Sequence, residues 1–299
     1  MQIQIVKYRK LWYAISGAIV LACVISIAMF GLKLGIDFTG GSLLQVSFPN
    51  PVVTTQLQSN VEKLGYKDVV VQATQDNGAL IRMQSLDETK HQELLKALKK
   101  TYGEKTTEQK FDSIGPVIGN ELQRTAGMGV VLILVLIGSY VAFTFRKVTQ
   151  PVASWKYGVL TIITAFHDVV VPLGVFAILG KLYGWEIDTA FVAAILTVLG
   201  YSITDTIVVF DRTRENLLKR LHVPFEETVD LSIRQTIRRS ISTSMTTLLC
   251  LAAIFFFGGD TTRPFALALI VGIFAGTYSS IFLASPALVT WEGFNKKKK

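Results

Sequence analysis

The residues most able to do chemistry in this sequence are a few ionisable side chains inside long apolar stretches. Asp205 interrupts the apolar stretch 189–210, and His167 and Asp168 stand together near the middle of another. Arg239 stands at the start of a third, close to several hydroxyl residues. An ionisable side chain at membrane depth costs about 2.5 to 3.5 kcal/mol on insertion scales, so each is a functional hypothesis by default.

Helical spacing sorts the polar residues of these stretches into faces. Arg239, Thr243 and Thr247 recur at intervals of four and are expected to share one face of a helix. Ser202 and Asp205 share another face at an interval of three. The other supporting polar positions are Thr206, His167, Asp168, Ser279 and Ser280, and Gly272 and Gly276 extend the last pair into a small-residue stripe that permits close helix approach.

Such a set of side chains suits ion coupling better than covalent catalysis. An apolar surrounding favours the neutral form of a carboxyl group, whereas a neighbouring guanidinium favours the charged form. A movement that separates Asp205 from Arg239 would therefore make the carboxylate take up a proton, and renewed pairing would release it. Moving one charge through 100 mV is worth about 2.3 kcal/mol, which biases a conformational equilibrium well over tenfold.

Each of these residues also has a structural interpretation. Ser, Thr and Gly in membrane spans are more often packing contacts, and Arg238 at a helix end is better explained by snorkelling to the interface. His167 with Asp168 is as consistent with a satisfied interior pair as with a functional one. A lone carboxylate in lipid needs a partner or a water path, so function is favoured at Asp205.

The composition shows what kind of protein must position these groups. Half of the 299 residues are hydrophobic and 17% are charged, against roughly 25% in soluble proteins, and the mean hydropathy is +0.44. Both cysteines lie in apolar runs, and no nucleophile–base pair or phosphate loop is visible, so we expect no enzyme, cofactor or metal, only a coupling ion, H⁺ or Na⁺. The sequence predicts a polytopic α-helical membrane protein with six transmembrane helices. These are 12–32, 125–145, 158–179, 189–210, about 241–257 and 264–290.

Basic residues predict the orientation of the spans. Short loops rich in Lys and Arg are held in the cytoplasm, and one alternating set of loops contains nearly all of them. Both termini are therefore expected to be cytoplasmic, at 1–11 and in the basic tail 291–299. The tail is better explained as a topology anchor than as a site for lipid or nucleic acid. A cytoplasmic amphipathic segment is expected at 212–239, with an interfacial helix carrying Phe225, Val229, Ile233 and Ile237 at fourfold spacing.

Between the first two spans, the extracytoplasmic segment 33–124 reads as a soluble domain. Alternating stretches predict strands and amphipathic stretches predict helices, in the order βαββαβ of a ferredoxin-like α+β fold. His91 stands in a Lys- and Glu-rich helix and is expected to be solvated at the surface. The predicted elements are 42–48, 51–64, 69–73, 79–83, 87–102 and 108–114, with a hairpin turn at Asp76-Asn77-Gly78.

Six short motifs, in order along almost the whole chain, resemble the SecF family of the Sec protein-export machinery. They are GIDFTGG at 35–41, SIGPVIG with Glu121-Leu122 at 113–122, His167-Asp168, the segment 200–215, QTIRRS at 235–240 and the segment 276–286. The first contains Asp37, Phe38, Gly40 and Gly41.

The resemblance implies half of a transporter of the resistance-nodulation-division type, with a SecD protein supplying the other half. Together they would use the proton or sodium motive force to pull unfolded polypeptide out of the SecYEG channel after the ATPase SecA. YajC, YidC and membrane lipid are further expected neighbours, and nucleic acid is not. The family's relay carboxylate and arginine correspond to Asp205 and Arg239, whereas Thr204 replaces an Asn expected in many relatives, so H⁺ and Na⁺ both stay open.

Two other functions are compatible with the same residues. One is a structural subunit that stabilises SecD or SecYEG without moving ions. The other is half of a lipid or drug exporter of the same architecture, although such exporters usually carry both halves in one chain. The small size of the external domain favours bracing a larger domain of SecD over holding the exported chain.

Overall fold

The structure, a computed structural model, describes residues 4–74, 77–146, 152–219 and 223–296 and divides into two units. One unit holds the membrane helices, and the other holds the external domain with residues Glu186–Thr189. Six helical segments of the described residues are long and apolar enough to cross a membrane, which confirms the predicted fold class. They are built from α1 (Arg9–Phe30), α5 (Pro116–Thr144), α6 (Ser154–Tyr183), α7 (Thr189–Lys219), α8 (Phe225–Phe257), and α9 (Arg263–Ser279) with its continuation α10 (Ser285–Lys296).

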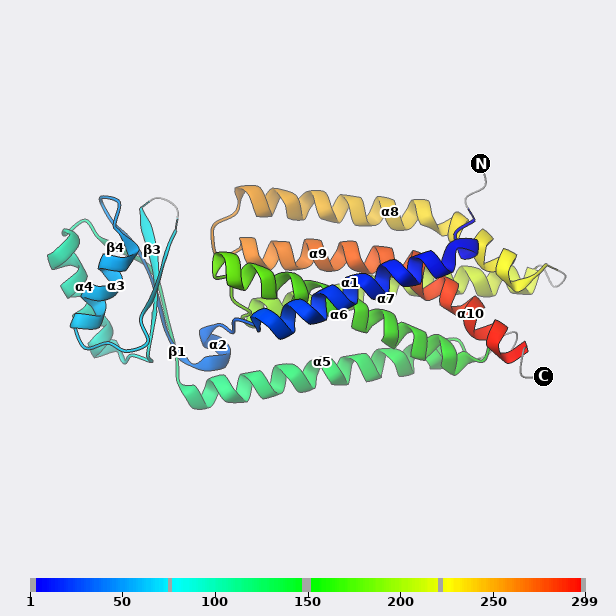
Figure 1. The fold of residues 1–299 in the computed structure, drawn as a ribbon, viewed down its shortest axis with the longest axis horizontal. Coiled ribbons are helices and arrows are strands. Elements are labelled where there is room, and N and C mark those ends of the chain that lie inside the picture. The colour runs from blue at the N-terminus through cyan, green and yellow to red at the C-terminus, as the bar shows by residue number, and fades with distance from the viewer. Residues whose placement is uncertain (1–3, 75–76, 147–151, 220–222, 297–299) are drawn as a thin grey trace. The chain divides into compact units, whose positions relative to one another are not determined.

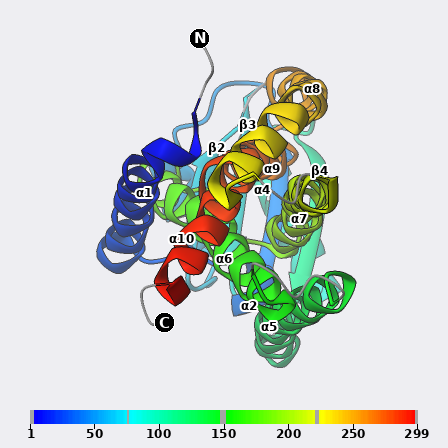
Figure 2. The ribbon, with the colours of Figure 1, turned by 90° about the vertical axis from the view of Figure 1, so that its right-hand side faces the viewer.

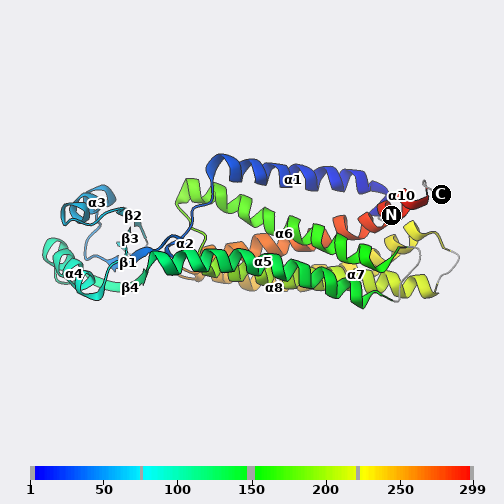
Figure 3. The same ribbon diagram turned by 90° about the horizontal axis from the view of Figure 1, so that it is seen from below.

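Within the membrane unit, α9 lies between α6 and α8, and α1 packs along the other side of α6 (Figures 2 and 3). Small residues set these distances, because a β-carbon at Gly174 of α6 would lie 2.3 Å from Cys23 Cβ of α1. A β-carbon at Gly158 of α6 would likewise lie 2.3 Å from the carbonyl oxygen of Gly138 in α5. Close backbone approach of this kind replaces the hydrophobic effect as the source of helix association in lipid.

The predicted sixth span is confirmed as a candidate membrane span, Arg263–Gly293, and it contains one irregular turn. Residues Ser280–Ala284 form one π-helical turn between α9 and α10. Pro286 cannot donate a backbone hydrogen bond, which interrupts the regular helical pattern here, and the Ser285 hydroxyl donates to the Ser280 carbonyl at 3.1 Å. The turn therefore widens the helix directly after Ser279 and Ser280, and π-turns of this kind are frequent at functional sites.

The interfacial helix predicted to lead into the fifth span is present as a helix and is continuous with that span, whereas its position at the interface stays a prediction. The helix α8 runs without interruption from Phe225 to Phe257, and α7 continues to Lys219, because no glycine or proline breaks either one at the membrane boundary. The stripe of Phe225, Val229 and Ile233 is buried, as its spacing required, but Ile237 is only half-buried. Predicted features at Asp76, Lys147, Arg220 and Lys297–Lys299 lie outside the described residues.

The external unit has the predicted element order and an antiparallel four-stranded sheet in the order β2-β3-β1-β4. Helices α3 and α4 cover one face of this sheet (Figure 1), and an apolar core that includes Leu44, Leu57, Ile81 and Leu94 fills the space between them. The elements are β1 (Gly41–Ser47), α3 (Thr54–Lys63), β2 (Val70–Ala73), β3 (Gly78–Met83), α4 (Glu88–Tyr102) and β4 (Thr107–Ile114).

The expectation that His91 is solvated is wrong. Its side chain is 4% exposed and stacks on Phe111 of β4, with ring centroids 3.7 Å apart. Its Nδ1 lies 3.2 Å from Glu88 Oε2 and its Nε2 lies 3.2 Å from Glu108 Oε1. His91 shares the buried face of α4 with three leucines, Leu94, Leu95 and Leu98, and this spacing outweighs the charged neighbours in sequence.

Candidate ion-relay site

The predicted pair of His167 and Asp168 forms the centre of a buried polar network. The Asp168 side chain is fully buried, and its Oδ1 lies 2.9 Å from His167 Nδ1. Its Oδ2 accepts hydrogen bonds from Ser202 of α7 at 2.5 Å and from Ser279 of α9 at 2.9 Å. Three helices therefore meet at one carboxylate, and these hydrogen bonds offset the cost of burying it.

Two glycines of α9 make this meeting possible. A β-carbon at Gly276 would lie 2.6 Å from Ser202 Cβ, and one at Gly272 would lie 2.4 Å from the side chain of Val198. The small-residue stripe predicted from the sequence therefore faces α7 and lets the two helices approach closely. This approach brings Ser202 and Ser279 to the same oxygen of Asp168.

Asp205 lies in a second and less complete polar site. Its side chain is 9% exposed, and its Oδ1 accepts one hydrogen bond, from the Ser240 hydroxyl of α8 at 3.1 Å. Its Oδ2 is buried and has no hydrogen-bond partner among the described residues. A carboxyl group left half-satisfied in an apolar surrounding is costly when ionised, so this oxygen is the natural place for a proton or another cation.

The predicted ion pair between Asp205 and Arg239 is not formed in this structure. Within the described part of the chain, no ion pair within 4.0 Å joins the two side chains, although Arg239 is close enough to act on Asp205 electrostatically. Arg239 and Thr243 are exposed on the outer face of α8, and Thr247 is half-buried. The predicted face of α8 is therefore real, but in the isolated chain it points away from the helix bundle.

A different stripe of hydroxyl residues faces the interior of the bundle. Ser232, Thr236, Ser240 and Ser244 follow one another at intervals of four along α8, and all are buried. Ser244 forms a hydrogen bond of 2.6 Å with Thr277 of α9. The sequence motif contained Ser240, but only the packing of α8 identifies it as the partner of Asp205, one residue away from the predicted Arg239.

The remaining predicted positions support the helices rather than contact Asp205. The hydroxyl of Thr206 donates to the Ser202 carbonyl at 3.2 Å, and the hydroxyl of Ser280 donates to the Thr277 carbonyl at 3.0 Å. Ser202, predicted to share a face with Asp205, binds Asp168 instead. The structure therefore separates the supporting polar residues into an Asp168 network and an Asp205 site.

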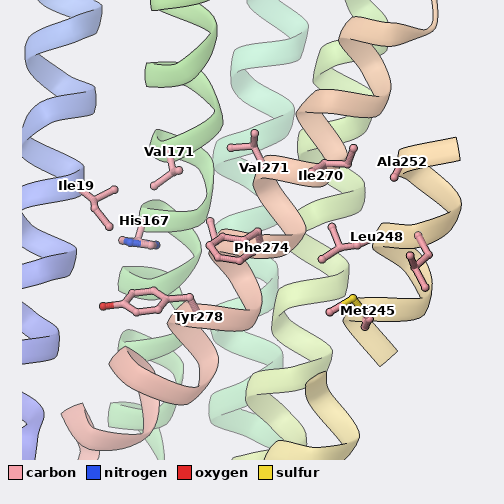
Figure 4. Close-up of a pocket in the computed structure, with 12 residues that line it drawn as sticks. Ile19, His167, Val171, Met245, Leu248, Ala252, Ile270, Val271, Phe274 and Tyr278 are labelled. Carbon is pink, nitrogen blue, oxygen red and sulfur yellow. The ribbon is translucent and has the colours of Figure 1, made fainter. Parts of the chain in front are cut away.

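An apolar cavity of about 650 Å³ lies against the first of these networks (Figure 4). Figure 4 shows His167 of α6 beside Tyr278 and Phe274 of α9, with Ile19 of α1 on one side and α8 on the other. The Nε2 atom of His167 is buried without a hydrogen-bond partner in the ranges that the structure covers. The ring is therefore held beside Asp168 through Nδ1, and its other nitrogen is not used by the network.

The glycine-rich motif after the first span lies in the external unit. Phe38 is buried, and Asp37 Oδ2 accepts hydrogen bonds from the backbone N–H and the hydroxyl of Thr189, the first residue of α7, at 2.8 and 2.6 Å. Gly40 and Gly41 have φ angles of +73° and +123°, which disfavour any side chain. Sequence reasoning gave these residues no structural role.

Comparison with known proteins identifies a family of membrane proteins to which this chain is similar. The family profile described as "Protein export membrane protein SecD/SecF, C-terminal" matches residues 94–293, and the "SecD/SecF GG Motif" matches residues 25–52. The protein translocase subunit SecF of Thermobaculum terrenum is 43% identical, over 97% of this chain and 94% of its own length. The SecF of Anaerolinea thermophila is 40% identical, over 97% and 94%.

A solved structure shows the same fold. The crystal structure of SecDF, described as a translocon-associated membrane protein, from Thermus thermophilus matches with a TM-score of 0.86 at 34% identity over 98% of this chain. This chain spans only 39% of that longer SecDF chain. With a profile match over most of its length and close relatives named SecF, the chain belongs to the SecD/SecF family of protein export membrane proteins, among its SecF subunits.

Proposed function

We propose that this chain is the SecF subunit of a protein-export complex in the inner membrane, and that Asp205 is its ion-binding group. The relatives named protein translocase subunit SecF support the export role. The longer SecDF chain, of which this chain matches 39%, supports a SecD protein as the missing partner. SecYEG, YajC and YidC are further proposed neighbours, and the exported polypeptide is the proposed cargo rather than a substrate of enzymatic chemistry.

The observation that carries the ion-binding proposal is that Asp205 Oδ2, at membrane depth, has no hydrogen-bond partner in the described part of the chain. In contrast, both oxygens of Asp168 have hydrogen-bond partners. A relay group must exist in two protonation states while the surrounding helices stay packed. The incompletely bonded Asp205 carboxylate meets this condition better than the fully bonded Asp168 carboxylate, which the helices need for their packing. We therefore assign Asp168 to positioning of α6, α7 and α9, and Asp205 to uptake and release of the ion.

Protons fit the site better than sodium ions. Hard metal cations such as Mg²⁺ and Ca²⁺ take about six or more oxygen ligands. Within the described residues, the Ser240 hydroxyl is the one side-chain hydrogen-bond partner of the Asp205 carboxylate. A proton requires a single oxygen, and protonation of Oδ2 would remove the cost of a buried charge.

The exposed face of α8 is proposed to meet the SecD partner. Arg239 and Thr243 place a cation and a hydroxyl on this outer face, next to the helix position that holds Asp205 through Ser240. A guanidinium at membrane depth is stabilised by a partner or by water, and a second chain against α8 would supply either. Movement of that chain would change how strongly Arg239 acts on Asp205, and so would drive proton uptake or release.

The chain is proposed to lie with both termini in the cytoplasm. Six spans place the two ends on the same side of a membrane, and the basic loops favour the cytoplasmic side. Contacts of the N-terminal segment agree with a shared end of the bundle, because the Val6 N–H donates to Asp230 and Arg9 pairs with Glu226 of α8.

Export into membrane vesicles tests the function. The exported polypeptide is first driven into the channel until ATP is exhausted. An imposed proton gradient should then complete its export in the parent complex but not in complexes with Asp205→Asn or Arg239→Met. Arg238→Met is the matched control, since Arg238 is an exposed neighbour on the same helix. Equal gradient-driven export in all variants would instead favour a structural subunit that moves no ions.

A further inference from the structure

The glycine-rich motif contains an aspartate, Asp37, that binds the residue at which α7 begins. The carboxylate of Asp37 accepts two hydrogen bonds from Thr189, where α7 begins. The first backbone N–H groups of a helix have no partner within the helix, and negative charge is favourable there. Asp37 therefore caps α7 from a distant part of the chain.

The backbone beside this cap is also paired. Gly35 donates to the Ile187 carbonyl at 2.8 Å, and Ile187 donates to the Lys33 carbonyl at 2.7 Å. Leu34 and Ile187 thereby form a short parallel bridge. The residues that lead into α7 are thus bound to the residues that lead from α1 into the motif.

Arg82 of β3 joins both segments to the sheet. Its Nη1 donates to Glu186 Oε1 at 2.7 Å and to the Leu34 carbonyl at 3.1 Å, and its Nη2 donates to Thr39 Oγ1 at 2.5 Å. The side chains of Arg82 and Glu186 are each only 20% exposed, so this ion pair is more shielded than an ordinary surface pair. One guanidinium thus holds three segments of chain in a fixed geometry.

The two glycines let the same motif pack against its neighbours. A β-carbon at Gly40 would lie 2.8 Å from Pro116 Cα, where α5 begins, and one at Gly41 would lie 2.8 Å from the Met83 carbonyl of β3. Both contacts are with backbone, which cannot move aside cheaply. The motif therefore joins the start of α5, the start of α7 and the central strands of the sheet.

From these contacts we infer that Asp37, Arg82 and Glu186 form a clamp that transmits movement of α7 to the external domain. This inference rests on the proposed function, because α7 carries Asp205, about 24 Å beyond Thr189 at 1.5 Å per residue. A change of protonation that shifts or rotates α7 pulls on Thr189 and Glu186, and the clamp passes this displacement to β3 and β1. Arg82 and Glu186 act as positioning residues and bind no ion themselves.

A charge-swap cycle in the complete complex tests the clamp. Arg82→Glu and Glu186→Arg should each lower gradient-driven export about tenfold, because each breaks the charge-assisted hydrogen bond between the two side chains. The double swap should recover most of that loss. The matched control is the exposed Lys110–Asp112 pair of β4, where Lys110→Glu should have no effect. Single variants that export like the parent, or a double swap no better than the worse single variant, would overturn the clamp.

Hydrogen exchange of the same complexes separates the clamp from the proposed function. In the clamp-intact complex, Asp205→Asn should change amide exchange in β3 severalfold, and this change should vanish when Arg82→Glu is also present. Exchange at Thr189 should rise about tenfold in Asp37→Asn. Unaltered exchange at Thr189 in Asp37→Asn would contradict the clamp, whether or not export changes. If exchange at Thr189 and in β3 changes as predicted while Asp205→Asn exports normally, only the ion-relay assignment is contradicted.

Discussion

Replacement of Gly276 by alanine should weaken the Asp168 network through packing alone. The added β-carbon would lie 2.6 Å from Ser202 Cβ, whereas carbon atoms in contact are normally about 3.5 to 4.0 Å apart. The helices α7 and α9 must therefore separate by about 1 Å. The Ser202–Asp168 hydrogen bond of 2.5 Å would then approach the 3.5 Å at which such a bond is effectively lost.

The loss of unfolding free energy in Gly276→Ala has three contributions. Overpacking costs about 1 to 3 kcal/mol, and a weakened hydrogen bond to a buried charge costs up to about 3 kcal/mol more. Alanine in place of glycine in a helix returns about 1 kcal/mol. The net loss should be up to about 5 kcal/mol, visible as a lower midpoint for thermal unfolding of the detergent-solubilised complex.

Two further variants make the measurement decisive. Gly200→Ala on α7 is the matched control, because a β-carbon there meets nothing within 4 Å, and it should unfold like the parent or later. The double variant Gly276→Ala with Ser202→Gly removes the clash and should recover the packing part of the loss, but not the hydrogen bond. If Gly276→Ala is as stable as Gly200→Ala, the close approach of α7 and α9 is not what holds the network together.

The external domain offers three further tests. Gly40→Ala should prevent accumulation of folded protein, since both its φ of +73° and the 2.8 Å approach to Pro116 forbid a β-carbon, and an immunoblot of membranes measures this. His91→Ala should cost about 2 kcal/mol or more by leaving a cavity, seen as faster amide exchange along β4. Hydrogen bonds from Gln92 and His91 lower the pKa of Glu88, so the stability they give α4 is present above the ordinary carboxyl pKa and is lost as pH falls through the lowered value. Gln92→Ala should move that loss to higher pH, as measured by amide exchange in the first turn of α4.

Hydrophobic periodicity predicted the spans and the external domain because it reflects burial directly. The strand and helix segments of the domain lie within a few residues of their predicted positions. The surface assignment of His91 was wrong because charged neighbours were weighed above its spacing to Leu94, Leu95 and Leu98. A residue one turn before a leucine stripe faces the core whatever its flanking residues are.

The hydrogen-bond partner of Asp205, Ser240, was missed for a similar reason. The prediction began the fifth span near Ile241 and chose the stripe that contains Arg239, although α8 is continuous from Phe225. Extending the buried stripe of Val229 and Ile233 by two helical turns leads to Ser240, which is the residue that binds Asp205. Adjacent residues of a helix differ by about 100° in direction. The buried face could therefore be predicted only by treating Phe225 to Phe257 as one continuous helix.

The clamp of the external unit was beyond sequence reasoning for another reason. Arg82, Asp37 and Glu186 are far apart in the chain, and each looks like an ordinary charged residue in a strand or loop. No periodicity relates them. Only the fold, which returns residues 186–189 to the sheet, brings these charges together.

Proton flux through the assembled complex tests the central role of Asp205 most directly. Vesicles that contain the parent complex should dissipate an imposed proton gradient during export, and Asp205→Asn should abolish this flux while assembly is preserved. Asp211→Asn is the control, because Asp211 is an exposed carboxylate six residues further along the same helix. Flux is expected in the parent and in Asp211→Asn only, whereas a flux with Asp205→Asn equal to that of the parent would contradict the role of Asp205 as the ion-binding group.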